Sequence, residues 1–415
     1  MPIIAKSKIS TGAAYTLSGQ QDIKVGANVV IKGDFCAIKA SGTGGHLISV
    51  QGWVEGLDYA IVVDTPGPNV RIVLGENAVA SSVNEQAIFS AANAATVVNQ
   101  GTVIGVSGIL FTGSGQNTVN NSGLIRGEIA GIDTFNGTSI KVINTGVIDG
   151  TDGSNIAIYG ANLRDVIINK GWLMGDVSLG GGNDLYDGRG GKFVYSIDGG
   201  AGRDTFIPGK LIETMNGGDG YDTVDFRQSA GGVYGPRDFA VNGLPTIDAF
   251  VNFERVLGSL KGADLFSVGT GSSTAQSLIG FGGNDTLKGG AASDNIDGGL
   301  GRDELAGRGG ADQFVYRNPG EGGDLISDFS VSFGDVIRVS AAGFEGGLTA
   351  GALAGGRFVS GSANIAGDAN DRFIFNINSE KLWFDRDGTG SKYAPVLIAD
   401  LQNGANMTAS DIVIF

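Results

Sequence analysis

Between residues 280 and 315 the chain reads GFGGNDTLK (280–288), GGAASDNID (289–297), GGLGRDELA (298–306) and GRGGADQFV (307–315). The sixth position of every copy is an aspartate: Asp285, Asp294, Asp303 and Asp312. The eighth is a large apolar residue: Leu287, Ile296, Leu305 and Phe314. The copies follow the nonapeptide pattern G-G-x-G-x-D-x-U-x, where U is large and apolar. A flexible glycine-rich linker would explain the glycines but not acids and apolar residues in phase, so we predict a parallel β-roll.

The spacing also predicts a ligand. Glycines in the first half of each copy let the chain turn tightly and expose carbonyl oxygens inside the turn. Two copies make one coil, so Asp285 stacks over Asp303 on one edge and Asp294 over Asp312 on the other. Carboxylate and carbonyl oxygens are the ligands that calcium prefers. We therefore expect several Ca²⁺ ions between stacked turns. The expected site residues in this block are the four aspartates with Gly280, Gly282, Gly289, Gly298 and Gly307.

Weaker copies of the repeat lie upstream. They are LGGGNDLYD (179–187) with Asp184, GGAGRDTFI (199–207) with Asp204, GGDGYDTVD (217–225) with Asp222, and a lone copy around Asp264. Asp204 and Asp222 are one coil apart and could share an ion. Asp184 is twenty residues from Asp204, and Phe193 stands where GRGGKFVYS (188–196) should carry its acid, so we expect that edge to be degenerate. The alternative for these copies is a solvated aspartate in a turn.

The N-terminal half repeats with a longer period. NQGTVIG (99–105), NSGLIRG (121–127), NTGVIDG (144–150) and NKGWLMG (169–175) share N-x-G-x-φ-x-G, where φ is apolar. Their asparagines are 22, 23 and 25 residues apart. This is the length of one coil of a right-handed parallel β-helix with three short strands, and we expect about seven coils over residues 20–178. The asparagines either form a hydrogen-bonded ladder or cap turns one by one.

Composition narrows the possible functions. The net charge of −15 makes nucleic acid and anionic membranes poor partners and divalent cations good ones. The single cysteine, Cys36, excludes an internal disulfide, and we expect it to be a small buried apolar residue. No run of about 18 apolar residues suggests a transmembrane helix. The N-terminus lacks the apolar stretch of a standard signal peptide, so we expect export by another route.

The C-terminal hundred residues alternate apolar and polar positions around polar turns, which is typical of strands. The segment Asp385-x-Asp387-Gly388-x-Gly390 resembles part of a calcium loop, but it lacks the later glutamate, and a hairpin turn is the favoured interpretation. The repeats, the D-x-I-x-D-F…G-D-x-I segment at 324–337, the L-x-x-D-x-D-G-x-G segment at 382–390 and the V-x-F-E-R-V-L-G-S segment at 251–259 together resemble RTX proteins. These are the hemolysin-type calcium-binding proteins of Gram-negative bacteria.

The resemblance covers roughly residues 179–415, and its C-terminal part is similar to that of serralysin-like secreted proteases. It implies type I export with an uncleaved C-terminal signal, and a secreted, extracellular or cell-surface location. The expected fold is all-β: a right-handed parallel β-helix (1–178), a calcium-binding β-roll (179–316) with a connector at about 226–278, and a C-terminal β-rich cap with the secretion signal (317–415). The resemblance does not cover the N-terminal half.

No catalytic constellation stands out. The single histidine, His46, cannot supply the two-histidine zinc site of a protease, and we expect it at the surface or in a turn. Some β-helices are polysaccharide lyases or epimerases, and Asp133, Asp149, Asp152, Arg126 and Lys141 are available for such chemistry. We expect no enzyme. The favoured function is a secreted structural or surface-associated calcium protein, such as an adhesin, matrix or surface-layer component. Its expected partners are calcium, the type I secretion apparatus, and either a second copy or cell-surface polysaccharide.

Overall fold

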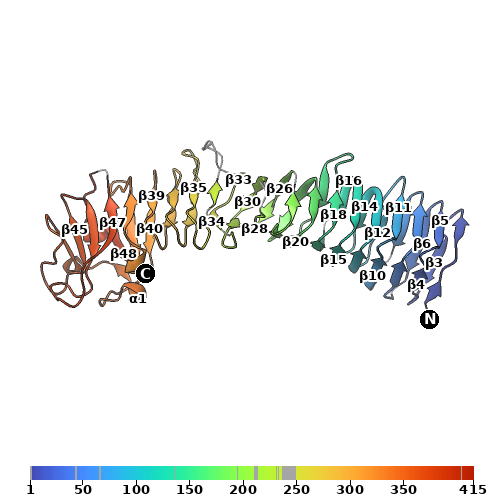
Figure 1. Cartoon of the computed structure of the whole chain (residues 1–415), viewed down its shortest axis with the longest axis horizontal. Helices are drawn as coiled ribbons and strands as arrows, with labels where there is room; N and C mark the ends of the chain where they lie inside the picture. Colours follow the sequence, from blue (N-terminus) through green and yellow to red (C-terminus); the bar gives the residue numbers. More distant parts are fainter. Residues whose placement is uncertain are drawn as a thin grey trace. The chain divides into compact units, whose positions relative to one another are not determined.

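The computed structural model describes residues 2–42, 44–64, 67–135, 137–193, 195–209, 214–229, 231, 233–235, 249–402 and 404–415. Within these ranges the regular secondary structure is almost entirely strand (Figure 1). The chain divides into two compact units. Unit 1 is Met1–Asp222 with Asp248–Asn252, and unit 2 is Thr223–Ile247 with Phe253–Phe415. Much of the predicted connector at 226–278 lies outside the described residues. No helix among the described residues is long and apolar enough to span a membrane.

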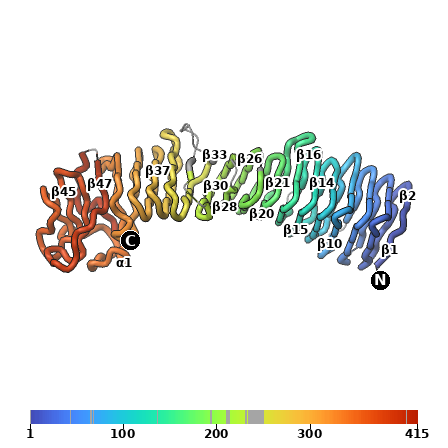
Figure 2. The backbone as a smooth tube through the Cα atoms, viewed as in Figure 1, coloured from blue at the N-terminus to red at the C-terminus, as the bar shows by residue number. Residues whose placement is uncertain are grey.

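Unit 1 is a stack of coils with three strands each, which Figure 2 shows from blue to green. Side 1 holds β1 (Ile3–Ile4), β4 (Ile23–Val25), β7 (Leu47–Val50), β10 (Pro68–Leu74), β13 (Ala94–Asn99), β15 (Gly115–Asn121), β17 (Thr138–Asn144), β20 (Val166–Asn169), β24 (Leu185–Asp187) and β28 (Thr205–Ile207). Side 2 holds β2 (Lys8–Ser10), β5 (Val30–Gly33), β8 (Trp53–Gly56), β11 (Val79–Ser82), β14 (Thr102–Phe111), β16 (Leu124–Thr134), β18 (Val147–Asp149), β21 (Trp172–Met174) and β25 (Lys192–Phe193). Side 3 holds β3 (Tyr15–Ser18), β6 (Cys36–Ser41), β9 (Tyr59–Val63), β12 (Ile88–Ser90), the later halves of β14 and β16, β19 (Ile156–Tyr159), β22 (Asp176–Ser178), β26 (Ser196–Asp198), β29 (Thr214–Asn216) and β33 (Ala249–Val251).

Alternation of side chains along each strand builds the core of unit 1. Every strand pair on side 1 is parallel, and the inward residues fall in register from coil to coil. The resulting fully buried column is Ile23, Ile48, Ile72, Val97, Val119, Val142 and Ile167. Each such side chain contributes about 1.5–3 kcal/mol when it leaves water. Side 1 has seven strands from β4 to β20, one for each of the seven coils expected over residues 20–178.

The repeated asparagines form a ladder inside the turn between sides 1 and 2. The Nδ2 of Asn99 donates to Oδ1 of Asn121 at 2.8 Å, Asn121 to Asn144 at 2.9 Å, and Asn144 to Asn169 at 2.9 Å. All four side chains are buried. The same Nδ2 atoms also donate to backbone carbonyls, as Asn121 does to Val147. The ladder interpretation is therefore confirmed.

Side 2 continues further along the chain than we expected. We placed the change from β-helix to β-roll near Leu179, with Phe193 at a lost acidic position. Instead β25 pairs with β21, and Phe193 aligns with Leu173. Phe193 is thus a strand residue of a three-sided coil and not a degenerate turn residue. The extra strand accounts for the coil of twenty residues between Asp184 and Asp204. Short parallel pairs link the turns of this region: β23 (Gly181–Gly182), β27 (Ala201–Gly202) and β30 (Asp219–Gly220).

Unit 2 has two parallel faces. One holds β31 (Thr223–Asp225), β34 (Arg255–Leu257), β36 (Ser277–Ile279), β38 (Asn295–Asp297), β40 (Gln313–Tyr316), β42 (Val336–Val339) and β48 (Ile412–Ile414). The other holds β32 (Tyr234–Gly235), β35 (Leu265–Ser267), β37 (Thr286–Lys288), β39 (Glu304–Ala306), β41 (Asp324–Ile326) and β47 (Val396–Leu401). Each nonapeptide of residues 280–315 supplies one strand, alternately to the two faces. The residue at the eighth position points inward, and Leu287, Ile296, Leu305 and Phe314 are all buried.

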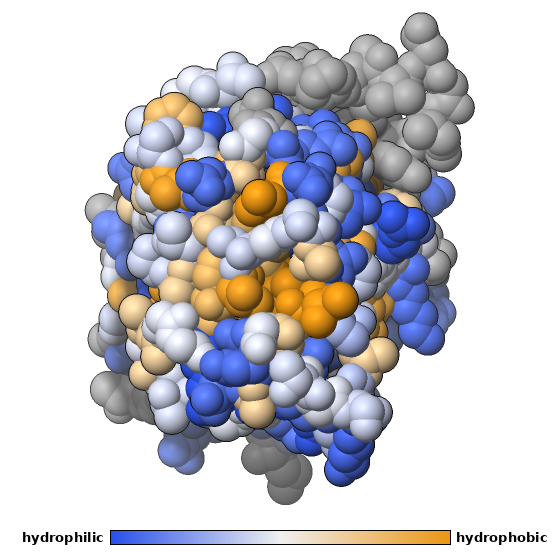
Figure 3. Space-filling view, turned by 90° about the vertical axis from the view of Figure 1, so that its left-hand side faces the viewer, coloured by the Kyte–Doolittle hydropathy of each residue, from blue (hydrophilic) through white to orange (hydrophobic). Residues whose placement is uncertain are grey.

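The C-terminal part of unit 2 departs from parallel pairing. β46 (Lys381–Phe384) pairs antiparallel with β45 (Phe373–Asn376) and with β47. β44 (Phe358–Gly361) pairs with β45 in parallel. The remaining elements are β43 (Gly351–Ala352), the helix α1 (Ala341–Phe344), and the 3₁₀ turns η1 (Pro319–Glu321), η2 (Gly355–Arg357) and η3 (Ala409–Asp411). Asp385 Oδ1 accepts from the backbone nitrogens of Asp387 and Gly388 in the β46–β47 connection, as expected for a hairpin turn. Figure 3 views this end of the chain, where apolar side chains gather within a polar surround.

Candidate metal centre

The aspartates of unit 2 stand in two columns, one along each edge of the roll. On the first edge the backbone nitrogen of each aspartate donates to Oδ1 of the aspartate one coil later. Asp264 donates to Asp285 at 2.7 Å, Asp285 to Asp303 at 2.8 Å, and Asp303 to Asp324 at 2.9 Å. We predicted Asp264 as a lone copy, but the structure makes it part of this column. The expected stacking of Asp285 over Asp303 is present.

The second edge repeats the arrangement with different residues. Asp294 donates to Asp312 at 2.8 Å, and Asp312 donates to Asp335 at 2.9 Å. One coil earlier Gln276 takes the aspartate's place, and its nitrogen donates to Asp294 at 2.7 Å. The expected stacking of Asp294 over Asp312 is therefore present as well.

Unit 1 carries a column of its own on side 1. The nitrogen of Ile140 donates to Asp165, Asp165 to Asp184, Asp184 to Asp204, and Asp204 to Asp222, each at 2.7 Å. We expected the edge to be degenerate between Asp184 and Asp204. That expectation was wrong, because the coil of twenty residues lengthens side 2 and leaves the turn before side 1 intact.

In each column, Oδ1 of an aspartate accepts a hydrogen bond from a backbone nitrogen of the preceding coil, and Oδ2 lies inside the turn. The Oδ2 atoms of Asp184, Asp204, Asp285 and Asp303 are buried and have no hydrogen-bond partner among the described residues. A buried carboxylate oxygen without a partner is unfavourable by several kcal/mol unless a proton or a cation joins it. These oxygens are thus suited to binding a cation.

The first glycine of each copy makes room for that oxygen. A Cβ on Gly280 would lie 2.2 Å from Oδ2 of Asp285 and 2.5 Å from the carbonyl oxygen of Gly298. A Cβ on Gly298, Gly289 or Gly307 would meet Oδ2 of its own aspartate at 2.2 Å, 2.2 Å and 2.0 Å, respectively. Gly282 forms a parallel bridge to Leu300 in the next coil. Oxygen atoms of carboxylates and carbonyls therefore line each turn, which is the donor set that suits calcium.

The protonation behaviour of these aspartates supports the same conclusion. Burial raises the pKa of Asp285, Asp303 and Asp312 to about 7, and that of Asp184 to about 8. Neighbouring carboxylates raise the values further, as Asp285 does for Asp303. For Asp264, which also accepts from Ser259, burial raises the pKa to about 6. Without a cation, the columns therefore hold their charge poorly near neutral pH.

Side chains alone do not define the site. Within the described residues, no group of three or more His, Cys, Asp or Glu side chains is arranged to hold a metal. The oxygen atoms that line each turn belong to one or two carboxylates and to backbone carbonyls, and only the spacing of the repeat identifies them.

Sequence reasoning missed three members of the columns: Asp165, Asp324 and Asp335. Asp324 and Asp335 follow their neighbours by 21 and 23 residues, so a search for a spacing of eighteen passes over them. Asp165 lies in GANLRDVII (160–168), which keeps the first glycine, the aspartate and the inward apolar residue but lacks the other glycines. A search for only those three positions would have found it.

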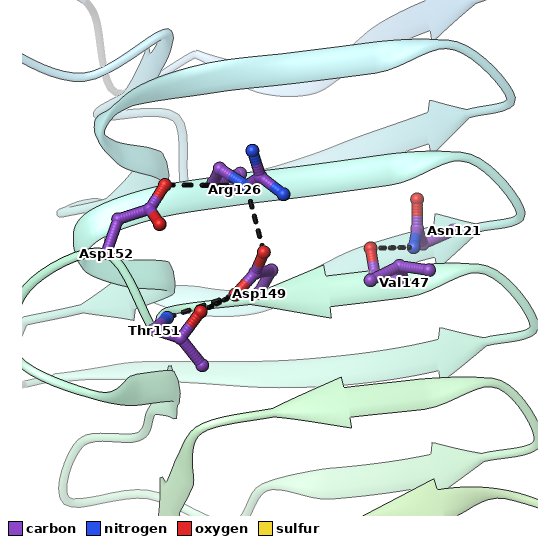
Figure 4. A network of polar contacts seen from close by, with 6 residues as sticks. All are labelled: Asn121, Arg126, Val147, Asp149, Thr151 and Asp152. Atoms are coloured by element: carbon purple, nitrogen blue, oxygen red, sulfur yellow. Dashed lines mark hydrogen bonds and ion pairs between the residues drawn. The ribbon is translucent and has the colours of Figure 1, made fainter.

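The residues considered for polysaccharide chemistry do not share a face. Arg126 lies on side 2 and pairs with Asp149 at 2.9 Å and with Asp152 at 3.6 Å (Figure 4). Burial would raise the pKa of Asp149, but hydrogen bonds from Thr151 and Arg126 outweigh it and lower the pKa. Asp133 lies in the side 3 part of β16, and Lys141 lies on side 1. The five residues thus do not form one catalytic cluster.

His46 and Cys36 are both structural. His46 lies in the connection between β6 and β7, so the turn alternative of our expectation holds and the surface alternative does not, since the side chain is buried. Its Nδ1 contacts the carbonyl oxygen of Gln21 at 2.6 Å. Cys36 is fully buried as expected, and this burial raises the pKa of its thiol to about 11. A thiol with so high a pKa is a poor nucleophile at neutral pH.

Comparison with known proteins agrees with the geometry. A family model described as RTX calcium-binding nonapeptide repeat (4 copies) matches residues 279–314. No curated protein matches the chain. The matched residues include Asp285, Asp294, Asp303 and Asp312, which form the centre of the two columns in unit 2. Residues 279–314 are therefore four RTX nonapeptide repeats, which bind calcium ions.

Proposed function

We propose that the chain is a secreted structural or surface-associated protein whose solenoid is completed by calcium after type I export. The observation that carries this proposal is the set of columns of buried aspartates with unpartnered Oδ2 atoms. These columns occupy turns in both units, so calcium would stabilise a large part of the chain and not one isolated loop. Asp133, Asp149 and Lys141 lie on three different sides of the coil, which also favours a structural role over an enzyme.

The residues that would hold the ions are those already lining the turns. On the first edge of unit 2 they are the carboxylates of Asp285 and Asp303 with the carbonyls of Gly280 and Gly298. Bound calcium supplies the positive charge that neutralises stacked carboxylates. The backbone nitrogens of the column keep Oδ1 of each aspartate in place, which leaves Oδ2 directed at the ion. The glycines exclude side chains from the same space.

The expected affinity for calcium would restrict folding of the repeats to the outside of the cell. Extracellular calcium modules bind at roughly 10⁻⁴–10⁻³ M. Cytosolic calcium is far lower, so the proposed sites would stay empty until the chain reaches the outside of the cell. Binding free energy then becomes folding free energy, as in other metal-dependent domains.

Export can be tested by removing residues 317–415, which we propose to contain the secretion signal. In a Gram-negative host with a type I apparatus, the full chain should appear in the medium and the truncated chain should stay inside the cell. A fusion of residues 317–415 to an unrelated carrier should restore export of that carrier. Equal export of the full and truncated chains would contradict this part of the proposal.

The structural role is tested by the assembly state. Electron microscopy and light scattering of the secreted protein should show filaments, sheets or surface-bound material with calcium, and dispersed protein after chelation. A strictly monomeric protein that also fails to bind cells or matrix in calcium would overturn the structural role.

The second candidate is a polysaccharide-active β-helix, which one pocket of unit 1 favours. The pocket has a volume of about 430 Å³ and includes Asp133, Phe135, Tyr159 and Asn162. Burial raises the pKa of Asp133, and Phe135 and Tyr159 expose 58% and 47% of their surface beside it. An aromatic surface next to a protonatable carboxyl group could hold and cleave a sugar chain.

Incubation with alginate or pectin separates the candidates. Release of unsaturated uronate by the native chain, lost in Asp133→Asn, would replace the structural proposal. The matched control is Asp152→Asn, an exposed aspartate of the same unit outside the pocket. Absence of product with both polymers would argue against a lyase acting on uronates.

A further inference from the structure

The second edge of unit 2 contains an arginine where its nonapeptide predicts glycine. Arg308 is the second residue of GRGGADQFV, and its φ of +68° lies in the left-handed region. A residue other than glycine in this conformation costs about 1–2 kcal/mol. The carboxylate of Asp328 holds the turn in place: the backbone nitrogen of Gly307 donates to its Oδ1 at 3.0 Å, and that of Arg308 to its Oδ2 at 2.8 Å.

The guanidinium group of Arg308 reaches back across two coils. Its Nη1 donates to the carbonyl oxygens of Val268 and Gly289, the latter at 2.8 Å, and its Nη2 donates to Oγ of Ser267 at 2.9 Å. Val268 and Gly289 each follow a strand of the same face and begin a turn. Their position in the turn is that of Gly280 and Gly298 on the first edge. Arg308 therefore binds the type of carbonyl that lines the proposed calcium sites.

The acidic residue expected at this level is missing. The turn that begins at Val268 carries Gln276 where the other turns of the column carry aspartate. The column therefore begins with a neutral side chain, followed by Asp294. The Oδ2 of Asp294 accepts from Gly290 at 2.6 Å, whereas Oδ2 of Asp285 and Asp303 on the first edge have no such partner. The two edges are thus not equivalent.

The charge of Arg308 is a further difference between the two edges of unit 2. The positive charge of Arg308 lies in the turn of Asp294, because Gly289, whose carbonyl oxygen the guanidinium binds, belongs to the same copy as Asp294. We infer that the Arg308 guanidinium replaces a calcium ion between the coils of Gln276 and Asp294, so that this level of the second edge carries its own cation. The inference rests on the proposed calcium sites of the roll.

The number of bound ions tests the inference. Calcium-45 equilibrium dialysis of the full chain should show that Arg308→Gly binds one more calcium ion than the native chain. Glycine suits the left-handed backbone at this position, so the variant should fold. Arg308→Lys retains the charge and should bind the same number of ions as the native chain. Arg302→Gln removes a positive charge from the other edge and should also leave the number unchanged.

Each result has a definite meaning. An equal number of ions in the native chain and in Arg308→Gly overturns the inference, while the proposed calcium sites remain supported. Binding of no calcium by the native chain overturns the proposed function and this inference with it. A gain in Arg302→Gln equal to that in Arg308→Gly would assign the effect to net charge and also overturn it. Arg308→Gln provides a second variant, for which the same gain is expected.

Discussion

At the scale of single residues, Asn121 joins three coils of unit 1 through one amide. It accepts from Asn99 and donates to Asn144 and to the carbonyl of Val147. Asn121→Ala should lower the free energy of unfolding by about 1–3 kcal/mol, because it removes the donor to the buried Oδ1 of Asn144 and to the carbonyl oxygen of Val147. Urea unfolding followed by circular dichroism measures the change.

The matched control for Asn121 is Asn84→Ala, which removes an exposed hydrogen bond to Asp58. That variant should change the free energy of unfolding by less than about 0.5 kcal/mol. Similar losses in both variants would show that the ladder contributes nothing beyond an ordinary surface contact.

Two aspartates of the same column should differ in their effect on calcium binding. Asp303 lies between Asp285 and Asp324 and presents an unpartnered Oδ2. Asp264 instead shares its carboxylate with the nitrogen and hydroxyl of Ser259. Asp303→Ala should weaken calcium binding about tenfold, which is ~1.4 kcal/mol, and Asp264→Ala should weaken it less. Isothermal titration calorimetry of both variants checks this order, and equal losses would contradict the stacking scheme.

At this scale the sequence predicted the residues whose spacing is regular. Asp285, Asp294, Asp303, Asp312 and the four ladder asparagines were identified, because each repeats in phase with an apolar neighbour. Asp324 and Asp335 were not, because coils of unusual length set their positions, and Asp165 was not, because its copy lacks the other glycines of the repeat. The burial of His46 was not predicted either, since it depends on the carbonyl of Gln21 in another coil.

At the scale of the structural element, the stability of each turn that contains a buried aspartate should depend on pH. The folded-state pKa values of Asp285, Asp303 and Asp312 are raised to about 7, above the ordinary value near 4. The calcium-free fold therefore binds protons more tightly than the unfolded chain. The resulting stabilisation is complete below the ordinary pKa and disappears as the pH rises through the raised values.

In calcium-free buffer the free energy of unfolding should consequently fall between about pH 5 and about pH 8. With saturating calcium the trend should disappear or reverse, because the ion binds the ionised carboxylates. Urea titrations across this range, with and without calcium, provide the measurement. A calcium-free protein that becomes more stable toward about pH 8 would disprove the assignment of buried, unpaired carboxylates.

The elements themselves were predicted more completely than their connections. Apolar alternation and the asparagine period predicted three strands per coil and the number of coils in unit 1. The continuation of side 2 to β25 was missed, because Lys192–Phe193 is too short to show alternation and lies inside a nonapeptide-like segment. The sequence also gave no sign that Arg308 would bind carbonyls two coils away.

At the scale of the whole molecule, the two kinds of coil should respond differently to calcium removal. The coils from β4 to β20 are held by the apolar column and the asparagine ladder, neither of which includes an ion. The turns of residues 160–222 and 258–335 contain the buried carboxylates. Chelation should therefore reduce the β signal in circular dichroism only in part, and hydrogen exchange should increase mainly within those two segments.

The control for this experiment is magnesium, which is smaller than calcium and retains its water more strongly. Magnesium at the same concentration should restore little of the lost signal. An unchanged β signal after calcium removal would refute calcium-dependent folding, and a complete loss would show that the coils from β4 to β20 also depend on the ions. The division of the chain into a β-helix (1–178), a β-roll (179–316) and a C-terminal cap (317–415) remains a prediction.

The aspartate columns have a direction that matters during folding. In these pairs the backbone nitrogen belongs to the earlier coil and the accepting carboxylate to the later one, 18 to 25 residues further along the chain. A coil therefore lacks the acceptor that completes it until the next coil has formed. A solenoid that grows from its N-terminal side keeps a single incomplete coil, and that incomplete end moves toward the C-terminus.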